Sequence, residues 1–280
     1  MKFDILSDVH LGYTAFNRTI PMAKYFPDKT ESDYLLIAGD LSEDAVGDET
    51  VKKFLTKASK LYKKVVVVLG NHDYWHLNED ERDETKEFET IPQKFAKFVK
   101  TFDKGNKIVV LNNNFVKLDD VWVYGTTLWS DIPPQHFLYI QRCMNDYRCI
   151  YREDGNFVTY FDTCKANFVA FNGISDFVST HRNDKVVILT HHSPSFKSRN
   201  PNYDQIIDYA YMNNYDNYII ENPNIVAWVS GHIHNKRDYM IGSTRILANP
   251  VGYVGEEGGF AERIYDGKKL VDWHLMSVEI

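Results

Sequence analysis

The sequence predicts a layered α/β fold. Continuous apolar, β-branched runs such as Val65–Leu69 suit strands that are buried on both faces. Between this run and an earlier one, residues 49–62 place apolar side chains at helical spacing, for example at Val51, Phe54 and Leu55. An alternation of strand, helix and strand is typical of layered α/β proteins.

The other elements are expected in chain order. Apolar runs predict strands at residues 2–6, 34–38, 65–69, 108–111, 115–118, 121–124, 186–189, 225–229, 237–241 and 244–247. Helical patterns also cover residues 79–102, with an interruption at Pro92, and residues 157–177, where Gly173 weakens the pattern. Gly242 and Ser243 separate the last two strands, which suits a tight hairpin turn.

Composition limits the class of protein. The 280 residues, 44% of them hydrophobic, are enough for one buried core with a sizeable insertion. A net charge of −7 does not suggest a general nucleic-acid binder, although bound cations can give a nuclease a local positive field. The three cysteines form no CxxC pair, and no secretory leader or membrane-spanning run is recognisable. A cytoplasmic protein with free thiols and no membrane partner is expected.

Residues 1–280 are expected to form a single domain, because neither an internal repeat nor a low-complexity linker divides the chain. The stretch from Trp129 to Tyr160 differs from the rest. It is rich in Tyr, Phe and Arg and shows no strand pattern. We expect residues 129–160 to form a cap inserted over the functional site.

Two short polar motifs follow the first two predicted strands. Asp8 and His10 are two positions apart, so in an extended segment their side chains point the same way. Asp40 follows Gly39 at the carboxyl end of the next strand, where open α/β sheets place their ligand sites. Taken alone, each motif is more often a simple surface turn.

Three further motifs are more specific. Gly70 is followed by Asn71, His72 and Asp73, which offer an amide oxygen, an imidazole and a carboxylate. His191 and His192 follow another buried strand; His191 is the preferred ligand because it comes first, with His192 at the rim or behind it, but the order could be reversed. After Gly231, the spacing of His232 and His234 places both imidazoles on one side.

The conjunction of the five motifs predicts one metal site. Each motif follows an apolar strand, and each offers ligands of the kind that metals prefer. Five such motifs at successive strand ends indicate convergence at one edge of a sheet. Carboxylate, amide oxygen and imidazole without thiolate suit Mn²⁺, Fe or Zn²⁺.

The order DVH, GD, GNHD, THH and GHIH resembles the calcineurin-like metallophosphoesterases. The resemblance implies a four-layer α/β/β/α sandwich and two divalent metal ions, with Mn²⁺ expected first and Fe, Zn²⁺ or Ni²⁺ as alternatives. It also implies ligand roles. One metal takes Asp8, His10 and His234, the other takes Asn71, His191 and His232, and Asp40 bridges them. His72 would be the general acid or a phosphate-binding residue, with Asp73 as its partner.

A second resemblance concerns residues 249–253, which are similar to an NPxGY turn found in small bacterial members of the family, often with Arg at x. Here x is Val251. A substitute for the missing guanidinium could come from the expected cap. Arg142, Arg148 and Arg152 are the candidates, with solvated surface charge as the alternative for each.

The expected function is hydrolysis of a phosphomonoester or phosphodiester by a metal-activated hydroxide, with a nucleotide-like small molecule as the favoured substrate. A nuclease or a protein phosphatase on the same scaffold is the alternative, so nucleic acid stays a possible partner. A non-catalytic binding module is disfavoured because every motif position holds a competent ligand.

Overall fold

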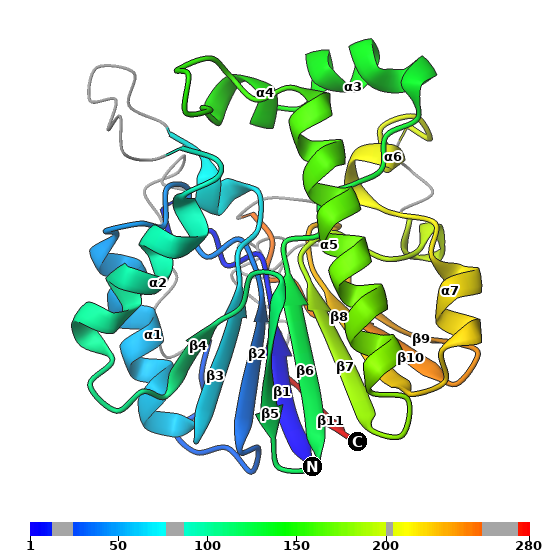
Figure 1. The fold of residues 1–280 in the computed structure, drawn as a ribbon. Helices are drawn as coiled ribbons and strands as arrows, with labels where there is room; N and C mark the ends of the chain where they lie inside the picture. Colours follow the sequence, from blue (N-terminus) through cyan, green and yellow to red (C-terminus); the bar gives the residue numbers. More distant parts are fainter. Residues whose placement is uncertain (13–24, 77–86, 200–203, 254–273) are drawn as a thin grey trace, which may run out of the picture.

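Two β-sheets lie face to face between outer layers of helices (Figure 1). The computed structural model describes residues 1–12, 25–76, 87–199, 204–253 and 274–280. The strands are β1 (Lys2–Leu6), β2 (Tyr34–Ala38), β3 (Lys64–Val68), β4 (Ile108–Val110), β5 (Asn114–Leu118), β6 (Val121–Thr126), β7 (Lys185–Thr190), β8 (Ile225–Ser230), β9 (Arg237–Ile241), β10 (Thr244–Ala248) and β11 (Met276–Glu279). The helices are α1 (Glu49–Leu61), α2 (Ile91–Phe102), α3 (Phe137–Cys143), α4 (Asp146–Cys149), α5 (Tyr160–Thr180), α6 (Asp208–Tyr211) and α7 (Asp216–Glu221), with 3-10 turns η2 (His72–Tyr74), η4 (Pro134–His136) and η5 (Phe196–Ser198).

Parallel pairing brings the carboxyl ends of the central strands to one edge. The first sheet has the order β11-β1-β2-β3-β4, and the second has the order β5-β6-β7-β8-β10-β9. The pairs from β1 to β4 are parallel, as are β6-β7-β8-β10, whereas β11, β5 and β9 are antiparallel edge strands. The polar motifs that follow β1, β2, β3, β7 and β8 therefore meet at the same edge.

Apolar burial on both faces of a strand explains the continuous apolar runs of the sequence. In β3, Val66 and Val68 pack into the core between the sheets, while Val65 and Val67 pack into the core beneath the helices. Phe54 of α1 joins this outer core. Ile174 of α5 packs into the corresponding outer core of the second sheet. The predicted α/β/β/α layering is confirmed.

One detail of the predicted helices is wrong. Pro92 does not interrupt a helix, because α2 begins at Ile91 and Pro92 occupies its first turn, where a missing N–H costs nothing. Residues 79–86 of that predicted helix lie outside the described residues. The helix predicted over residues 157–177 is present as α5, which runs unbroken through Gly173; a Cβ at this position would clash with the hydroxyl of Tyr124.

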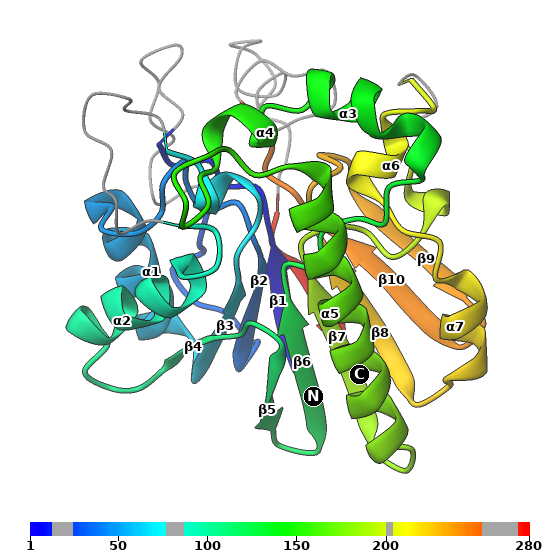
Figure 2. The ribbon, with the colours of Figure 1, turned by 45° about the horizontal axis from the view of Figure 1, so that its top comes forward.

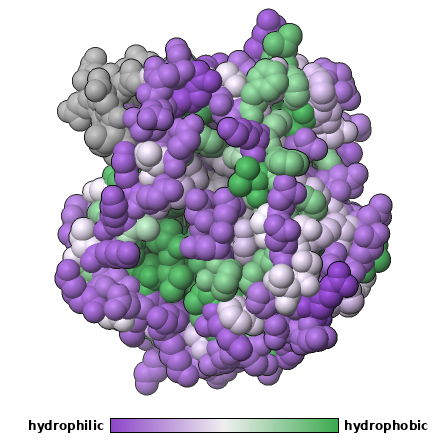
Figure 3. Space-filling view, viewed as in Figure 1, coloured by the Kyte–Doolittle hydropathy of each residue, from purple (hydrophilic) through white to green (hydrophobic). Residues whose placement is uncertain are grey.

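The segment 129–160 includes η4, α3 and α4, and both helices lie at the top of the molecule, away from the helix layers that flank the sheets (Figures 1 and 2). Apolar side chains are exposed on α3 and α5, at Leu138, Phe161 and Phe168. Hydrophobic surface is also visible at the top of the face drawn in Figure 3. Among the described helices, none combines the length and the hydropathy needed to cross a bilayer.

Candidate metal centre

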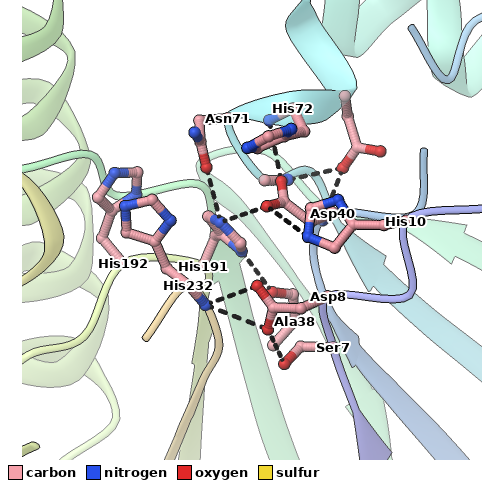
Figure 4. Close-up of polar contacts among 12 residues, drawn as sticks. Ser7, Asp8, His10, Ala38, Asp40, Asn71, His72, His191, His192 and His232 are labelled. Carbon is pink, nitrogen blue, oxygen red and sulfur yellow. Dashed lines mark hydrogen bonds and ion pairs between the residues drawn. The ribbon is translucent and has the colours of Figure 1, made fainter. Parts of the chain in front are cut away.

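The seven residues predicted as metal ligands converge at the carboxyl edge of the two sheets. All of them except His234 are labelled in Figure 4. Six of them are buried, and His234 is partly buried. They arrive from five strand ends: Asp8 and His10 after β1, Asp40 after β2, Asn71 after β3, His191 after β7, and His232 and His234 after β8.

The backbone at these strand ends has an unusual conformation. Asp8, His10 and Asp40 have positive φ angles of 54°, 48° and 52°, and so do His232 (68°) and His234 (45°). Residues other than glycine adopt this left-handed region at a cost of about 1–3 kcal/mol each, and such residues cluster at functional sites. At this edge, side chains that follow strands of the first sheet meet those that follow strands of the second, for example where His234 lies 3.3 Å from Asp8.

Gly39 permits the close approach of the motifs. Its own φ is 85°, and an added Cβ would lie 2.5 Å from the nitrogen of Gly70 and 2.6 Å from Nδ1 of His191. The glycine of the GD motif is therefore required both by the backbone conformation and by the space between three loops.

A first group of possible ligands contains Asp8, His10, Asp40 and His234, whose ligand atoms all lie within 4.8 Å of one another. Nε2 of His234 lies 3.2 Å from Nε2 of His10 and 3.3 Å from Oδ1 of Asp8. Nε2 of His10 lies 3.7 Å from Oδ2 of Asp40.

A second group contains Asp40, His191 and His232. Nε2 of His191 lies 3.3 Å from Oδ2 of Asp40 and 2.9 Å from Oδ1 of Asn71, so the amide oxygen joins this group. Asp40 belongs to both groups, which is the position that a bridging carboxylate needs. A further group of His10, Glu43 and His72 satisfies the same distance limit, but Glu43 already contacts Nδ1 of both imidazoles there.

The donor atoms fit divalent cations. Nδ1 of His10 lies 2.8 Å from Oε1 of Glu43, and Nδ1 of His191 lies 2.8 Å from the carbonyl oxygen of Ala38. Each imidazole thus donates outward from Nδ1, and this tautomer directs the lone pair of Nε2 into the cluster. Among the described residues, the buried atoms Oδ2 of Asp40 and Nε2 of His232 have no hydrogen-bond partner. Lone pairs that face one another in the interior need positive charge between them.

The electrostatics of the ligand residues agree with this fit. Burial lowers the pKa of His191, but the carboxylates of Asp40 and Asp8 and the carbonyl oxygen of Ala38 together outweigh burial and raise that pKa to about 9. Burial raises the pKa of Asp40, yet His191 and His72 hold it well below its usual value, so the carboxylate is ionised. The cluster attracts positive charge, which a proton or a cation can supply.

His72 lies beside the clusters, with a different set of neighbours from the one expected. Its Nε2 lies 2.9 Å from the Tyr253 hydroxyl, its Nδ1 lies 3.4 Å from Oε1 of Glu43, and its ring stacks on Trp75 at a centroid distance of 3.6 Å. Burial lowers the pKa of His72, but Asp40 and Glu43 reverse this effect, and the resulting pKa is raised. His72 can therefore hold a proton next to the ligands.

Asp73 is not the partner of His72, so that expectation is wrong. Its carboxylate accepts hydrogen bonds from the backbone N–H groups of Asp40, Leu41, Ser42 and Gly70, at 2.8–3.2 Å. Asp73 thus holds the turn that carries Asp40. The backbone N–H of His72 in turn donates to Oδ1 of Asp40 at 2.9 Å.

The residues suggested for substrate contact do not line the cavity beside the ligands. His192 is 1% exposed, its Nδ1 faces the carbonyl oxygen of Thr127, and its ring packs near Trp129, so it is an interior residue and not a rim residue. Burial and the neighbouring His191 lower its pKa to about 3, which keeps it neutral.

The three arginines are not brought to the site either. Arg142 and Arg148 are exposed, and Arg148 donates to Asn145 at 3.0 Å. Arg152 lies 2.7 Å from Asp154 in an ion pair. None of them lines the cavity next to the metal ligands, because the segment directs other side chains there.

Sequence reasoning missed three residues of the site. Glu43 follows Asp40 by three positions and could have been found as a second carboxylate of the same loop. Tyr253 is the last residue of the NPxGY turn, so this motif could have identified it. Asp146, in the 129–160 segment, contacts Asn71, and no motif marks it.

A cavity of about 430 Å³ opens beside the ligands. Its lining includes Asp40, Asn71 and the histidines 72, 232 and 234. Residues 143–145 of the 129–160 segment and residues 204, 207, 208, 211 and 212 also line it.

Comparison with known proteins agrees with this architecture. The family model described as calcineurin-like phosphoesterase matches residues 1–236. An uncharacterized protein of Acanthamoeba polyphaga mimivirus is 30% identical over an alignment of 279 residues. The alignment covers 93% of this chain and 94% of that protein.

Solved structures show the same fold. The phosphopantetheinyl hydrolase of Mycobacterium tuberculosis superposes with a TM-score of 0.72 at 17% identity. The superposition covers 99% of this chain and 95% of the hydrolase chain. A Thermus thermophilus protein superposes with a TM-score of 0.50 at 12% identity, covering 93% of this chain and 90% of its own. The chain belongs to the calcineurin-like phosphoesterase family and is a metal-dependent phosphoric ester hydrolase.

Proposed function

We propose that this protein hydrolyses a small phosphate ester at a centre of two divalent ions, preferably Mn²⁺. Asp8, His10 and His234 would hold one ion, Asn71, His191 and His232 the other, and Asp40 both. Such a pair of ions supplies Lewis acidity and lowers the pKa of a water. The observation that supports this proposal most directly is the carboxylate of Asp40. Its buried Oδ2 has no hydrogen-bond partner among the described residues and faces histidine nitrogens of both groups.

The residues around the ligands support distinct roles. Glu43 and the carbonyl oxygen of Ala38 fix the ring orientations of His10 and His191. His72, whose pKa is raised, would donate a proton to the leaving oxygen or a hydrogen bond to a phosphate oxygen. Tyr253, 2.9 Å from Nε2 of His72, can relay that proton, accepting it at its oxygen while its own hydroxyl proton passes to the leaving oxygen.

The cavity supports a small substrate whose leaving group has no further negative charge. The described residues that line it include no Lys or Arg, but they include Asp204 and Asp208. Asp208 is already paired with Arg199 at 3.0 Å, so a second phosphate or a polyanionic backbone would meet the Asp204 carboxylate with no cationic side chain in the lining. A nucleoside or another uncharged alcohol fits better, and we propose that the 129–160 segment selects it through residues 143–145.

A turnover screen tests the proposal. Protein loaded with Mn²⁺ is assayed with p-nitrophenyl phosphate, bis-p-nitrophenyl phosphate, a nucleoside monophosphate, a cyclic nucleotide, a phosphopantetheine ester and single-stranded DNA. Hydrolysis of one or more small esters is expected, with no activity in an Asp40→Asn control. Preferential cleavage of DNA would favour a nuclease, and no turnover with any divalent metal would refute the proposal.

A further inference from the structure

Asp146 is a buried carboxylate in the 129–160 segment, where the buried residues near it in the chain, Met144, Tyr147 and Ile150, are hydrophobic. It is the first residue of α4 and is 4% exposed, whereas its neighbours Asn145 and Arg148 are exposed. Carboxylates are rarely buried to this degree unless they are hydrogen-bonded. The partners of Asp146 therefore indicate why it is there.

The side chain of Asp146 accepts two hydrogen bonds, both from residues of the loop that carries the ligand Asn71. Its Oδ1 accepts a hydrogen bond from Nδ2 of Asn71 at 2.8 Å and another from Nε1 of Trp75 at 2.7 Å. Asn71 and Trp75 lie on either side of η2, in the loop that follows β3. One oxygen atom thus joins the 129–160 segment to the GNHD loop.

The bond to Asn71 decides which atom of its amide faces the metal ligands. An asparagine amide has nearly the same shape in its two orientations, and only its hydrogen-bond partners distinguish oxygen from nitrogen. Because Nδ2 of Asn71 donates to Oδ1 of Asp146, Oδ1 of Asn71 faces Nε2 of His191 at 2.9 Å. In the opposite orientation an N–H group would face the metal, and Asn71 could not bind it.

The bond to Trp75 acts on His72. The indole ring of Trp75 stacks on the imidazole of His72, with 3.6 Å between the centroids and 27° between the planes. A hydrogen bond at Nε1 fixes the rotation of the indole and therefore the surface against which the imidazole lies. Asp146 thus reaches the proposed proton donor through a single side chain.

We propose that Asp146 is a positioning residue, through which the 129–160 segment orients Asn71 toward the second metal and His72 toward the substrate. The inference rests on the proposed two-metal function and adds a second task to the segment beside lining the cavity. Asp146 need only accept two hydrogen bonds at one oxygen, and an asparagine at this position can also do so.

Metal titration calorimetry and steady-state kinetics on the full chain test this proposal. Asp146→Ala is expected to bind the second equivalent of Mn²⁺ about 10–100-fold more weakly, because residues that orient metal ligands typically contribute that much, while the first equivalent is unchanged. Asp146→Asn should retain most of the wild-type affinity. Trp75→Phe keeps an aromatic ring beside His72 but removes the Nε1 donor. This variant should bind both metals normally, with kcat about fivefold lower.

Asp154→Ala is the matched control. Asp154 is a carboxylate of the same segment, but it is exposed and pairs with Arg152 at the surface, so its removal should change neither metal binding nor kcat. Thermal melting shows whether each variant is folded. If Asp146→Ala does not fold, Trp75→Phe decides, and a wild-type kcat in that variant overturns the proposal.

Two other results would overturn it. Wild-type affinity for the second metal in folded Asp146→Ala would show that Asn71 keeps its orientation unaided. An equal loss in the Asn and Ala variants would show that the negative charge matters and not the position of the acceptor. Wild-type protein that binds no metal or hydrolyses no ester refutes the proposed function instead, so the two failures are distinguishable.

Discussion

Replacing His72 by alanine is expected to slow the hydrolysis of alkyl phosphates far more than that of aryl phosphates. The substitution removes the imidazole but keeps the backbone N–H that donates to Oδ1 of Asp40 at 2.9 Å. His72 is absent from both groups of proposed ligands, so the metals should remain bound. Only the proton donor beside the substrate is lost.

The size of the effect follows from the surroundings of the imidazole. Asp40 and Glu43 raise the pKa of His72 against the effect of burial, so the imidazolium is available near neutral pH. A positioned general acid contributes about 10²–10⁴-fold to the rate, equivalent to about 3–5 kcal/mol of transition-state stabilisation. An alkoxide needs this proton, whereas p-nitrophenolate departs without it.

The assay compares kcat for glycerol phosphate and p-nitrophenyl phosphate in the wild type and in His72→Ala, with the metal content of both proteins measured. A loss of about 10²–10⁴-fold is expected for the alkyl ester and a much smaller one for the aryl ester. Equal losses would refute acid catalysis and assign His72 to phosphate binding. Tyr253→Phe serves as the companion variant, because a relay through its hydroxyl predicts the same dependence on the leaving group.

Three further predictions follow from single contacts. Asp40→Ala should reduce bound metal from about two equivalents to less than one in elemental analysis, because Asp40 belongs to both ligand groups. Gly39→Ala should lower the melting temperature and abolish metal binding, since its Cβ would lie 2.6 Å from Nδ1 of His191 and φ is positive there; an active, fully metallated variant would contradict this. Arg152→Ala should leave the ratio of rates for large and small esters unchanged, because Arg152 pairs with Asp154 away from the cavity; a selective loss for the larger ester would restore Arg152 as a substrate residue.

The fold and the ligand-type residues could be predicted because they depend on local patterns. A strand buried on both faces, such as β3, appears in the sequence as an unbroken apolar run. The end of such a strand fixes where the next polar residue lies, so motifs that are far apart in the chain can be assigned to one edge. Pro92 misled the helix prediction because it marks the first turn of a helix as readily as a break.

The contacts that support the ligands could not be predicted in the same way, because they depend on distance in space. Asp73 stands next to His72 in the sequence, yet the 3-10 turn η2 directs its carboxylate to four backbone N–H groups of two loops. Asp146 lies 75 residues from Asn71 and still bonds its amide. The end of a strand fixes the backbone position of a ligand residue. Its amide or imidazole group also needs a hydrogen-bond partner that sets its orientation. That partner can come from any segment that passes nearby, so this part of the chemistry is determined by the tertiary fold.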